Sequence, residues 1–242
     1  MPPPRLFCPE LTEGQTVLSA EESHHAVAAL RARPGQRVIL FDGAGREACA
    51  VIEAVEAGRL TVRVERIQLR PFELTIRLTL AVAMGRAHRQ GYLIEKCTEL
   101  GVAAIQPVIT ARSVARPADR MVEKWFRRAV EAAKQSGRSW VPTIECPRPL
   151  GNVLENVDRF DAAFLALPGP GHASFAALLT RQRPDTSVLV WIGPEGGFTD
   201  EERRIVRESG AAAVTLAPTT LRTETAAVAA CAICAAAACH GS

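Results

Sequence analysis

Two segments of the sequence combine residue types that can bind a small ligand and move a proton. The first is Gly193-Pro194-Glu195-Gly196-Gly197, where glycines let backbone amides approach a ligand closely. The second is Leu221-Arg222-Thr223-Glu224-Thr225, where Arg222 is a permanently charged donor and Glu224 is an acceptor two residues away. A proton acceptor beside a donor for developing negative charge suits acid–base chemistry with electrostatic stabilisation. The alternative is that Arg222 pairs with Glu224 or Glu195 only to hold the loop.

The glycine loop leads into a helix with clear end signals. Thr199 and Glu202 have the spacing of a capping box, Asp200 and Glu201 load the positive end of the helix dipole, and Gly210 ends the helix. The loop is neither a Gly-x-Gly-x-x-Gly fingerprint nor a P-loop, and the acids already complement the helix terminus where a phosphate would bind. Alone, the loop is compatible with a ligand site or with a tight turn that binds nothing.

The elements that must position these residues alternate between strands and helices from residue 74 onward. Runs 161–167, 187–192 and 211–216 are short and apolar, as is typical of strands buried on both faces of a parallel sheet. Each precedes a loop with Gly or Pro, and the carboxyl ends of parallel strands meet at one edge, so we expect these loops to converge on one pocket. The other expected elements are strands 74–83, 102–109 and 141–145 and helices 91–100 and 119–136, with Gly101 and Gly137 at the helix ends.

The first 70 residues have a different pattern, typical of a small β-barrel or sandwich. Runs 37–42, 47–53 and 60–65 are separated by turns that contain glycine. Ser23 is expected to cap a short helix that ends at Leu30. Arg70-Pro71-Phe72 is the expected linker. We therefore predict two domains, 1–70 and 74–242.

Composition places the chain among ordinary globular proteins. Of its 242 residues 48% are hydrophobic and 23% charged, which excludes collagen, coiled coil and general disorder. The longest nearly apolar run, 226–239, has 14 residues and is shorter than the roughly 20 that span a bilayer. The first residues do not resemble a signal peptide. We expect a cytoplasmic protein without a membrane segment.

Positive charge is concentrated in the middle of the chain. Residues 85–148 carry twelve Lys/Arg and six Asp/Glu, whereas residues 1–70 carry nine of each. A basic segment in an otherwise neutral or acidic chain is compatible with a polyanion such as RNA, or with a solvated Arg-rich helix face. The candidates for phosphate contact are Arg112, Arg116, Arg127, Arg128 and Arg138.

Seven cysteines, an odd number without framework spacing, favour a reducing compartment. Cys231, Cys234, Cys239 and His240 resemble a zinc ligand set, but they lie in a segment that strongly favours helix. No second cysteine pair at finger spacing is present in the sequence. We therefore predict small core thiols and no metal.

The two motifs together resemble those of a known family. Trp191 to Thr199, followed by Leu221 to Ala226, is similar to the RsmE family of SPOUT-class methyltransferases. Segments 95–102, 112–114 and 132–138 agree with the family as well, so the similarity covers nearly the whole chain. Two segments depart from it: the family usually has Gly-Pro-Arg where this chain has Ala217-Pro218-Thr219, and Arg86 to Gln90 lacks the usual Lys/Gly/Asp-rich form.

The resemblance implies both a fold and an activity. The fold is a mainly parallel α/β SPOUT domain tied in a trefoil knot, preceded by a small PUA-like RNA-binding β-barrel. The activity is transfer of a methyl group from S-adenosylmethionine to N3 of a uridine in 16S ribosomal RNA, within the small ribosomal subunit, by a homodimer.

The resemblance also assigns roles to residues. Arg222 and Glu224 are the expected catalytic residues. The residues expected to bind the cofactor are Leu165, Leu167, Gly193, Glu195, Gly196, Gly197, Leu216, Leu221, Arg222 and Thr223. Two other functions are compatible with the sequence: an RNA-binding ribosome-assembly factor without transfer activity, and a ribose 2′-O-methyltransferase of the same fold. The intact motif pair favours base methylation over both.

Overall fold

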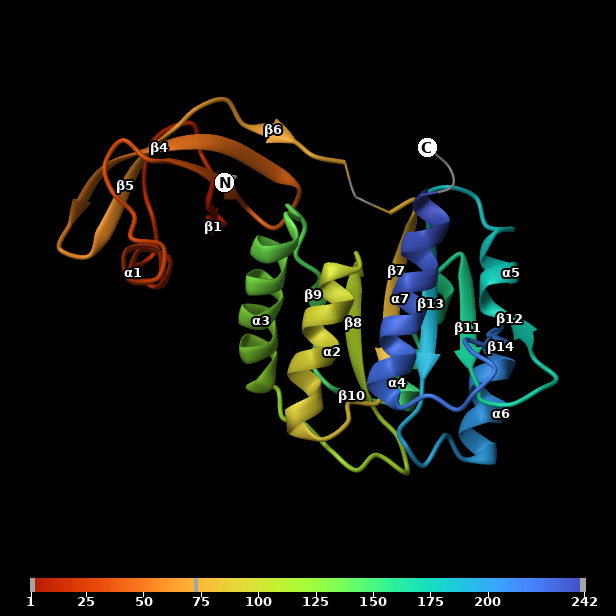
Figure 1. Cartoon of the computed structure of the whole chain (residues 1–242). Helices are drawn as coiled ribbons and strands as arrows, with labels where there is room; N and C mark the ends of the chain where they lie inside the picture. The colour runs from red at the N-terminus through yellow and green to blue at the C-terminus, as the bar shows by residue number, and fades with distance from the viewer. Residues whose placement is uncertain (1–2, 72–73, 240–242) are drawn as a thin grey trace. The chain divides into compact units, whose positions relative to one another are not determined.

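The computed structural model describes residues 3–71 and 74–239 and divides into two compact units (Figure 1). The first comprises Met1–Phe72 and Val130–Val141, and the second comprises Glu73–Ala129 and Pro142–Ser242. Residues 130–141 thus pack with the N-terminal unit, whereas the expected bounds 1–70 and 74–242 place them in the second domain. Those bounds stay a prediction, and Phe72 of the expected linker lies outside the described residues.

The second unit is built on a parallel sheet. Its described strands are eight, ordered β10-β8-β7-β13-β11-β14-β12 with β9 paired to β8, and every described pair is parallel. The central strands are nearly continuous apolar runs because they are buried on both faces. The strands are β7 (Ile76–Val82), β8 (Ala104–Ile109), β9 (Thr143–Ile144), β10 (Arg148–Pro149), β11 (Ala162–Ala166), β12 (Ala173–Ser174), β13 (Thr186–Ile192) and β14 (Ala212–Thr215).

Helices cover this sheet, and in Figure 1 α2 and α7 stand side by side in front of it. The two pack against each other, and α7 also packs on β7 and β13. The helices of this unit are α2 (Ala87–Glu99), α4 (Leu150–Leu154), η1 (Val157–Arg159), α5 (Phe175–Leu179), α6 (Asp200–Glu208) and α7 (Thr223–Cys239). Helix α3 (Met121–Ser136) is divided between the two units at residue 130. None of the helices in the described ranges is long and apolar enough to span a membrane.

The predicted helix ends are confirmed, whereas one predicted start is wrong. Gly101, Gly137 and Gly210 follow α2, α3 and α6 with φ of +91°, +79° and +94°, the left-handed conformation in which a helix stops. Helix α2 begins at Ala87 rather than at residue 91. The prediction failed because Gly91 looks like a boundary, although it lies inside the helix with open space around its α-carbon.

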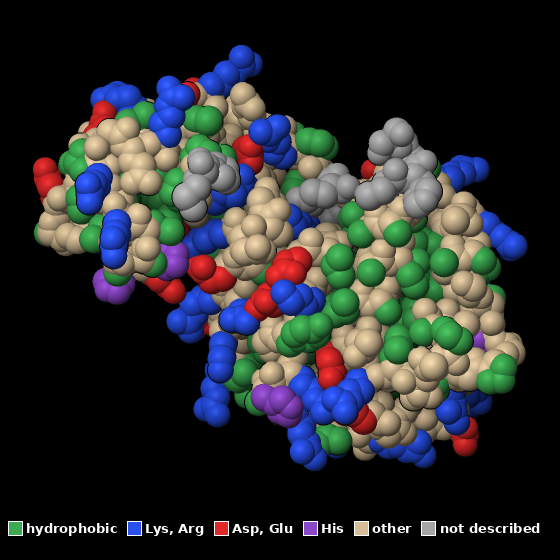
Figure 2. All heavy atoms as spheres, viewed as in Figure 1, with side chains coloured by type: hydrophobic (Ala, Val, Ile, Leu, Met, Phe, Trp, Pro, Cys, Tyr) green, Lys and Arg blue, Asp and Glu red, His purple; other side chains and the backbone are tan. Residues whose placement is uncertain are grey.

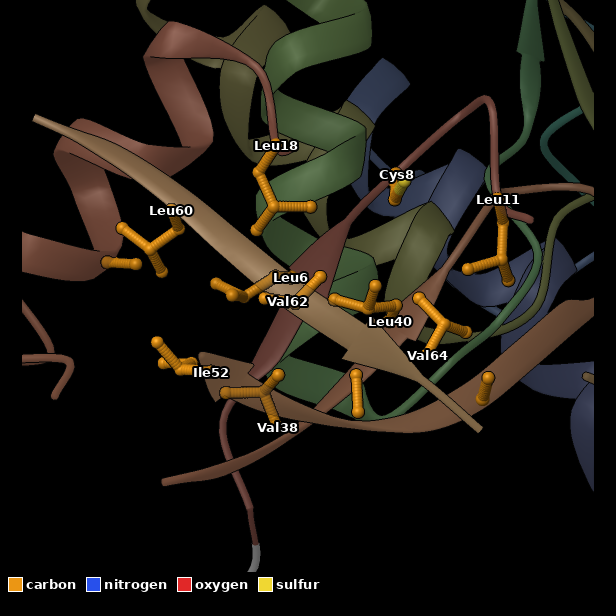
Figure 3. Close-up of a cluster of buried hydrophobic side chains, with 13 residues drawn as sticks. Leu6, Cys8, Leu11, Leu18, Val38, Leu40, Ile52, Leu60, Val62 and Val64 are labelled. Carbon is orange, nitrogen blue, oxygen red and sulfur yellow. The ribbon is translucent and has the colours of Figure 1, made fainter. Parts of the chain in front are cut away.

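The first unit is a mostly antiparallel sheet. β1 (Arg5–Phe7), β3 (Arg37–Phe41), β4 (Arg46–Glu56), β5 (Arg59–Val64) and β2 (Gly14–Val17) pair in that order, and β6 (Gln68–Leu69) pairs with β4. Figure 3 shows apolar side chains from these strands pointing toward one another. Leu6, Leu40, Ile52 and Val62 among them are fully buried. Residues 60–65 alternate apolar and polar side chains, and the apolar ones, Leu60, Val62 and Val64, are buried.

Helix α1 (Ala20–Ala28) of this unit begins at a different serine from the expected one. Ser19 is the cap, and its hydroxyl accepts a 3.2 Å hydrogen bond from Glu22 N. Ser23 is buried inside the helix, where its hydroxyl accepts a 3.0 Å bond from Leu60 N. The predicted cap at Ser23 is wrong because its hydroxyl satisfies a strand amide instead of a helix terminus.

A buried carboxylate explains why residues 130–141 belong with the first unit. Glu47 on β4 accepts hydrogen bonds from Arg5 at 3.1 Å, from Arg70 at 2.6 Å and from the hydroxyl of Ser139. Arg5 also donates to the carbonyl of Arg138 at 3.1 Å. Burial alone would raise the pKa of Glu47, but the bonds from Ser139, Arg70 and Arg5 hold it below its ordinary value. Glu47 thus joins the N-terminal strands to the segment after α3.

Glu47→Gln is expected to destabilise the first unit. Because the pKa of Glu47 is lowered by folding, its ionised form stabilises the folded state above the unfolded pKa, and this contribution is lost as pH falls through the folded pKa. Loss of charged hydrogen bonds should cost about 1.5–3 kcal/mol of unfolding free energy at pH 7, with a smaller cost at pH 3. Urea unfolding at both values measures this, with Glu56→Gln on an exposed part of β4 as the control. An equal cost at the two pH values would contradict it.

Candidate functional site

A cavity of about 310 Å³ lies at the carboxyl ends of β11, β13 and β14. Its walls come from the loops after these three strands, so the predicted convergence is confirmed. Arg112, Arg203 and Thr219, which stands where the family usually has an arginine, also line it. The main lining residues are Ala166, Leu167, Ile192, Gly193, Glu195, Gly196, Gly197, Phe198, Leu216, Thr219, Leu221 and Thr223.

Most of the residues expected to bind the cofactor line this cavity. They are Leu167, Gly193, Glu195, Gly196, Gly197, Leu216, Leu221 and Thr223. Leu165 is absent from the lining because its side chain is fully buried in the core beside Trp191. Its neighbours Ala166 and Leu167, at the strand end, line the cavity instead. Arg222 is also absent from the lining, and its side chain is exposed.

The glycine loop is held by hydrogen bonds to its carbonyls. Thr223 donates from its hydroxyl to Gly193 O at 3.0 Å, and Arg112 donates to Gly196 O at 2.9 Å. Gly197 has φ of +67°, which allows its amide to bond back to Pro194 O at 2.8 Å. With these carbonyls occupied, the loop's backbone is fixed, and its glycines leave the cavity wall without side chains.

The capping box at the start of α6 forms as the sequence predicts. Thr199 Oγ1 accepts from Glu202 N at 3.1 Å, and Glu202 Oε2 accepts from Thr199 N at 2.8 Å. Glu202 Oε1 also accepts from Ala111 N at 2.7 Å, a contact that the sequence did not reveal. This second bond fixes the backbone next to Arg112. The carboxylate therefore positions both the glycine loop and the arginine that bonds to it.

An ion-pair cluster adjoins the cavity. Arg89 Nη1 lies 3.5 Å from Glu195 Oε1 and 3.4 Å from Glu224 Oε1. Glu224 is only 9% exposed, and its second oxygen, Oε2, has no hydrogen-bond partner among the described residues. The alternative considered from the sequence, an ion pair of Arg222, is not found within residues 3–71 and 74–239. Arg89 pairs with both carboxylates instead.

Sequence reasoning missed Arg89 because its partners lie more than a hundred residues away. One signal could have found it: Arg89 follows the carboxyl end of β7, the edge at which the site residues gather. It stands in the segment Arg86 to Gln90, which departs from the family pattern and to which the sequence assigned no role.

Two family models match this chain. Residues 72–235 match the RNA methyltransferase domain family, and residues 18–65 match the RNA methyltransferase PUA domain. Ribosomal RNA small subunit methyltransferase E of Mycobacterium bovis is 34% identical, over 89% of this chain and 84% of its own length. The Bacillus subtilis protein of the same name is 30% identical, over 86% of this chain and 85% of its own length.

A solved structure is similar along nearly the whole chain. Ribosomal RNA small subunit methyltransferase E from Neisseria gonorrhoeae, bound to S-adenosyl methionine, superposes with a TM-score of 0.84 at 30% identity and 95% coverage of both chains. This chain belongs to the ribosomal RNA small subunit methyltransferase E family. The predicted resemblance and fold class are thereby confirmed: a mainly parallel SPOUT-class α/β domain with a PUA-like N-terminal unit.

The structure distinguishes among the basic residues that the sequence proposed for RNA contact. Arg112 and Arg116 are exposed, and exposed Arg127 lies 3.8 Å from Glu123. Arg128 pairs with Glu95. Arg138 is only 5% exposed. Its burial corrects its selection as a phosphate contact, because a guanidinium in the interior of the first unit cannot reach a polyanion.

The cysteine cluster lies partly outside the described residues. Cys231 and Cys234 are buried in α7, and burial raises the pKa of the Cys234 thiol. His240 and the side chain of Cys239 are not described. Within the described part of the chain, no three His, Cys, Asp or Glu residues are arranged to hold a metal ion.

Proposed function

We propose that this chain transfers a methyl group from S-adenosylmethionine to N3 of a uridine in 16S ribosomal RNA of the small subunit. The observation that carries the proposal is a cavity bounded by the glycine loop. It adjoins the buried carboxylate of Glu224, one oxygen of which has no hydrogen-bond partner among the described residues. The family membership supports an RNA methyltransferase. The cofactor is supported by the similar Neisseria gonorrhoeae structure, which holds S-adenosyl methionine.

The cavity has the properties that this cofactor needs. Its volume is near the lower end of the roughly 300–1,000 Å³ typical of ligand pockets. Leu167, Leu216 and Leu221 offer apolar surface for an adenine ring, and Gly196 and Gly197 leave backbone accessible. Glu195 adds negative charge beside a cationic ligand. When bound, S-adenosylmethionine supplies an electrophilic methyl group on its sulfonium.

Gly196→Val is expected to weaken cofactor binding without unfolding the protein. A Cβ at Gly196 would lie 3.5 Å from Arg112, an ordinary contact, so the loop tolerates it while the rest of the side chain narrows the cavity. Calorimetric titration with S-adenosylmethionine should show at least about tenfold lower affinity, equivalent to about 1.4 kcal/mol. Gly151→Val, in open space on α4, is the control and should bind normally. Unchanged affinity in Gly196→Val would contradict this assignment.

The chemistry requires N3 of uracil to lose its imide proton before it becomes a good nucleophile. Negative charge then spreads onto O2 and O4. We assign proton removal to Glu224, whose buried Oε2 has no hydrogen-bond partner within residues 3–71 and 74–239. We assign charge stabilisation to Arg222, whose exposed guanidinium is available to a base. Because a folded RNA stacks or pairs its bases, the target uridine must turn out to reach these groups.

Single-turnover methylation of small-subunit rRNA from cells that lack the protein tests this chemistry. With saturating S-adenosylmethionine, Glu224→Gln and Arg222→Ala should each lower the rate by about 100-fold or more, while cofactor affinity stays within about twofold. Arg207→Ala, an exposed position on α6, is the control.

Mass mapping of the product nucleosides distinguishes the alternatives. A methyl on the uracil base supports the proposal. A methyl on ribose would identify a 2′-O-methyltransferase, and RNA binding without transfer would identify an assembly factor. Unchanged rates in both variants would reject the assigned catalytic roles.

We propose that RNA is bound through the first unit and, separately, through exposed arginines of the second. The PUA match supports the first, and the exposure of Arg112, Arg116 and Arg127 supports the second. Arg128 is a weaker candidate because Glu95 already neutralises it. Small ribosomal subunits as substrate would place the protein in the cytoplasm, as the sequence predicts.

Arg116→Ala is expected to reduce the salt dependence of RNA binding. Each lysine or arginine on a phosphate releases counterions, so removing one true contact should lower the slope of log affinity against log salt by about one. Filter binding of small-subunit rRNA over a range of salt concentrations measures this slope. Arg207→Ala should leave it unchanged, and a flat dependence in the wild type would argue against phosphate contacts.

We also propose that the protein is a homodimer that buries the surface of α7. Residues 225–239 of this helix carry no charged side chain, although Thr225, Ala232 and Ala236 are exposed. Figure 2 shows hydrophobic side chains gathered over this region, and Tyr92 on neighbouring α2 is 50% exposed. Surface helices normally have a charged or polar face, so this one suits contact with a second copy.

Ala232→Glu is expected to dissociate this dimer. A charge at an exposed position of α7 would be desolvated in the interface, whereas Ala28→Glu, exposed at the end of α1 in the first unit, leaves α7 unaltered. Sedimentation at micromolar protein concentrations should give a dimer for the wild type and the control and a monomer for Ala232→Glu. A monomeric wild type would reject the proposal.

A further inference from the structure

Arg89 occupies a central place at the edge of the sheet. It lies in the first turn of α2, the helix that follows β7 in the chain. Glu195 comes from the loop after β13, and Glu224 comes from the first turn of α7. The ends of β7 and β13 are tied by a 2.9 Å bond from Ala83 N to Ile192 O. Three segments that are distant in the sequence thus bring one guanidinium between two carboxylates.

The contacts of Arg89 leave most of its donors unused. Its separations of 3.4 and 3.5 Å from the two carboxylates are ion-pair distances, longer than the 2.7–3.2 Å of a hydrogen bond. No side-chain hydrogen bond of Arg89 is found among the described residues, although a guanidinium carries five N–H donors. Its side chain is 26% exposed, so a ligand can reach it.

The neighbouring acceptor is unused as well. Glu224 Oε2 is buried without a hydrogen-bond partner in the described part of the chain, although buried polar atoms are nearly always satisfied. A buried acceptor and a set of unused donors therefore lie next to each other beside the cavity. Glu195, which lines that cavity, pairs with the same guanidinium nitrogen as Glu224, Nη1.

We infer that Arg89 and Glu224 together recognise the edge of a uracil ring. Glu224 Oε2 accepts the N3–H, and Arg89 donates to an adjacent carbonyl oxygen, O2 or O4. This inference rests on the proposed function and names the group that selects its substrate base. Glu195 acts as a positioning residue that keeps the guanidinium in place.

The same pair of groups rejects cytosine. Cytosine presents a lone pair at N3, where uracil has a proton, and an amino group in place of O4. The carboxylate would face a lone pair, and the guanidinium would face a second donor. Sites built to hydrogen-bond a particular edge discriminate strongly because the wrong edge leaves buried polar groups unpaired. A role limited to neutralising two carboxylates would give no such selection.

The test compares the wild type with variants of Arg89 on rRNA in which one carbonyl oxygen of the target uracil is replaced by sulfur. Small-subunit rRNA carrying uridine, 2-thiouridine or 4-thiouridine at the mapped target position is methylated under single-turnover conditions. Sulfur accepts hydrogen bonds more weakly than oxygen, and it alters the acidity of N3–H equally for every enzyme. The thio effect is the rate on uridine divided by the rate on the thio-substituted RNA. A difference in this ratio between the wild type and Arg89→Ala therefore isolates the contact between Arg89 and that carbonyl.

We expect Arg89→Ala to be about 100-fold slower on uridine, with cofactor affinity retained. The thio effect at one carbonyl should be about tenfold larger in the wild type than in the variant. Arg89→Lys keeps the charge between the carboxylates but lacks the planar fork, and it should stay about tenfold slower than the wild type. Arg86→Ala, exposed at the start of the same helix, should retain the wild-type rate.

Equal thio effects in the wild type and Arg89→Ala at both carbonyls would overturn the inference while leaving the proposed function intact. So would full recovery of the rate by Arg89→Lys, since a point charge would then suffice. If the wild type methylates no uridine in the rRNA, the proposed function fails, and the inference fails with it.

Discussion

Parallel pairing at the centre of the second unit is the constraint on which the site depends. β13 is hydrogen-bonded to β7 along its whole length and to β11 over five residues, in parallel register on both sides. Parallel strands end at the same edge, so every loop that follows them must begin there. The buried side chains of β13 include Trp191 and Val190, whose packing fixes the strand before the glycine loop starts. The chemistry of the loops therefore begins from a rigid edge.

Polar groups of the loops at this edge form hydrogen bonds with one another. Glu202 caps α6 and also holds the amide of Ala111, while Thr223 and Arg112 occupy carbonyls of the glycine loop. Such bonds fix backbone positions that loops otherwise sample freely, and preorganised groups lose less entropy on binding. The cluster of Arg89, Glu195 and Glu224 differs because it retains unused donors and an acceptor. Unused polar groups beside a cavity point to a ligand.

Local patterns in the sequence predicted those features of the structure that depend on residues close together in the chain. The capping box of Thr199 and Glu202, the glycine helix ends and the apolar strands were confirmed because each has a short-range physical cause. The convergence of three loops was predictable because it follows from parallel strand direction alone. The identity of the cofactor was different, since it came from the resemblance of two long motifs.

Those local patterns could not predict contacts between residues that are far apart in the sequence. Ser23 looks like a helix cap, but it satisfies a strand amide 37 residues away. Arg138 counts as surface charge in a tally of basic residues, yet it is buried where residues 130–141 join the first unit. The knot implied by the resemblance is a property of the whole chain path, and no local pattern reports it. Arg89 was missed for the same reason, because its importance lies only in which carboxylates surround it.

The position of Glu224 shows how the fold can keep a buried carboxylate without fully satisfying it. A buried polar atom without a partner costs folding free energy, and Oε2 of Glu224 has no hydrogen-bond partner in the described part of the chain. Two compensating groups are close: the guanidinium of Arg89 and the positive end of the α7 dipole, since Glu224 lies in the first turn of that helix. Neither acts through a hydrogen bond to Oε2, so the charge can be stabilised while that oxygen remains available. A cap or a close bidentate partner would stabilise the folded chain more, but it would also occupy the atom that the proposed proton transfer needs. The arrangement therefore gives up part of the stability available at this position to keep an acceptor free beside the cavity.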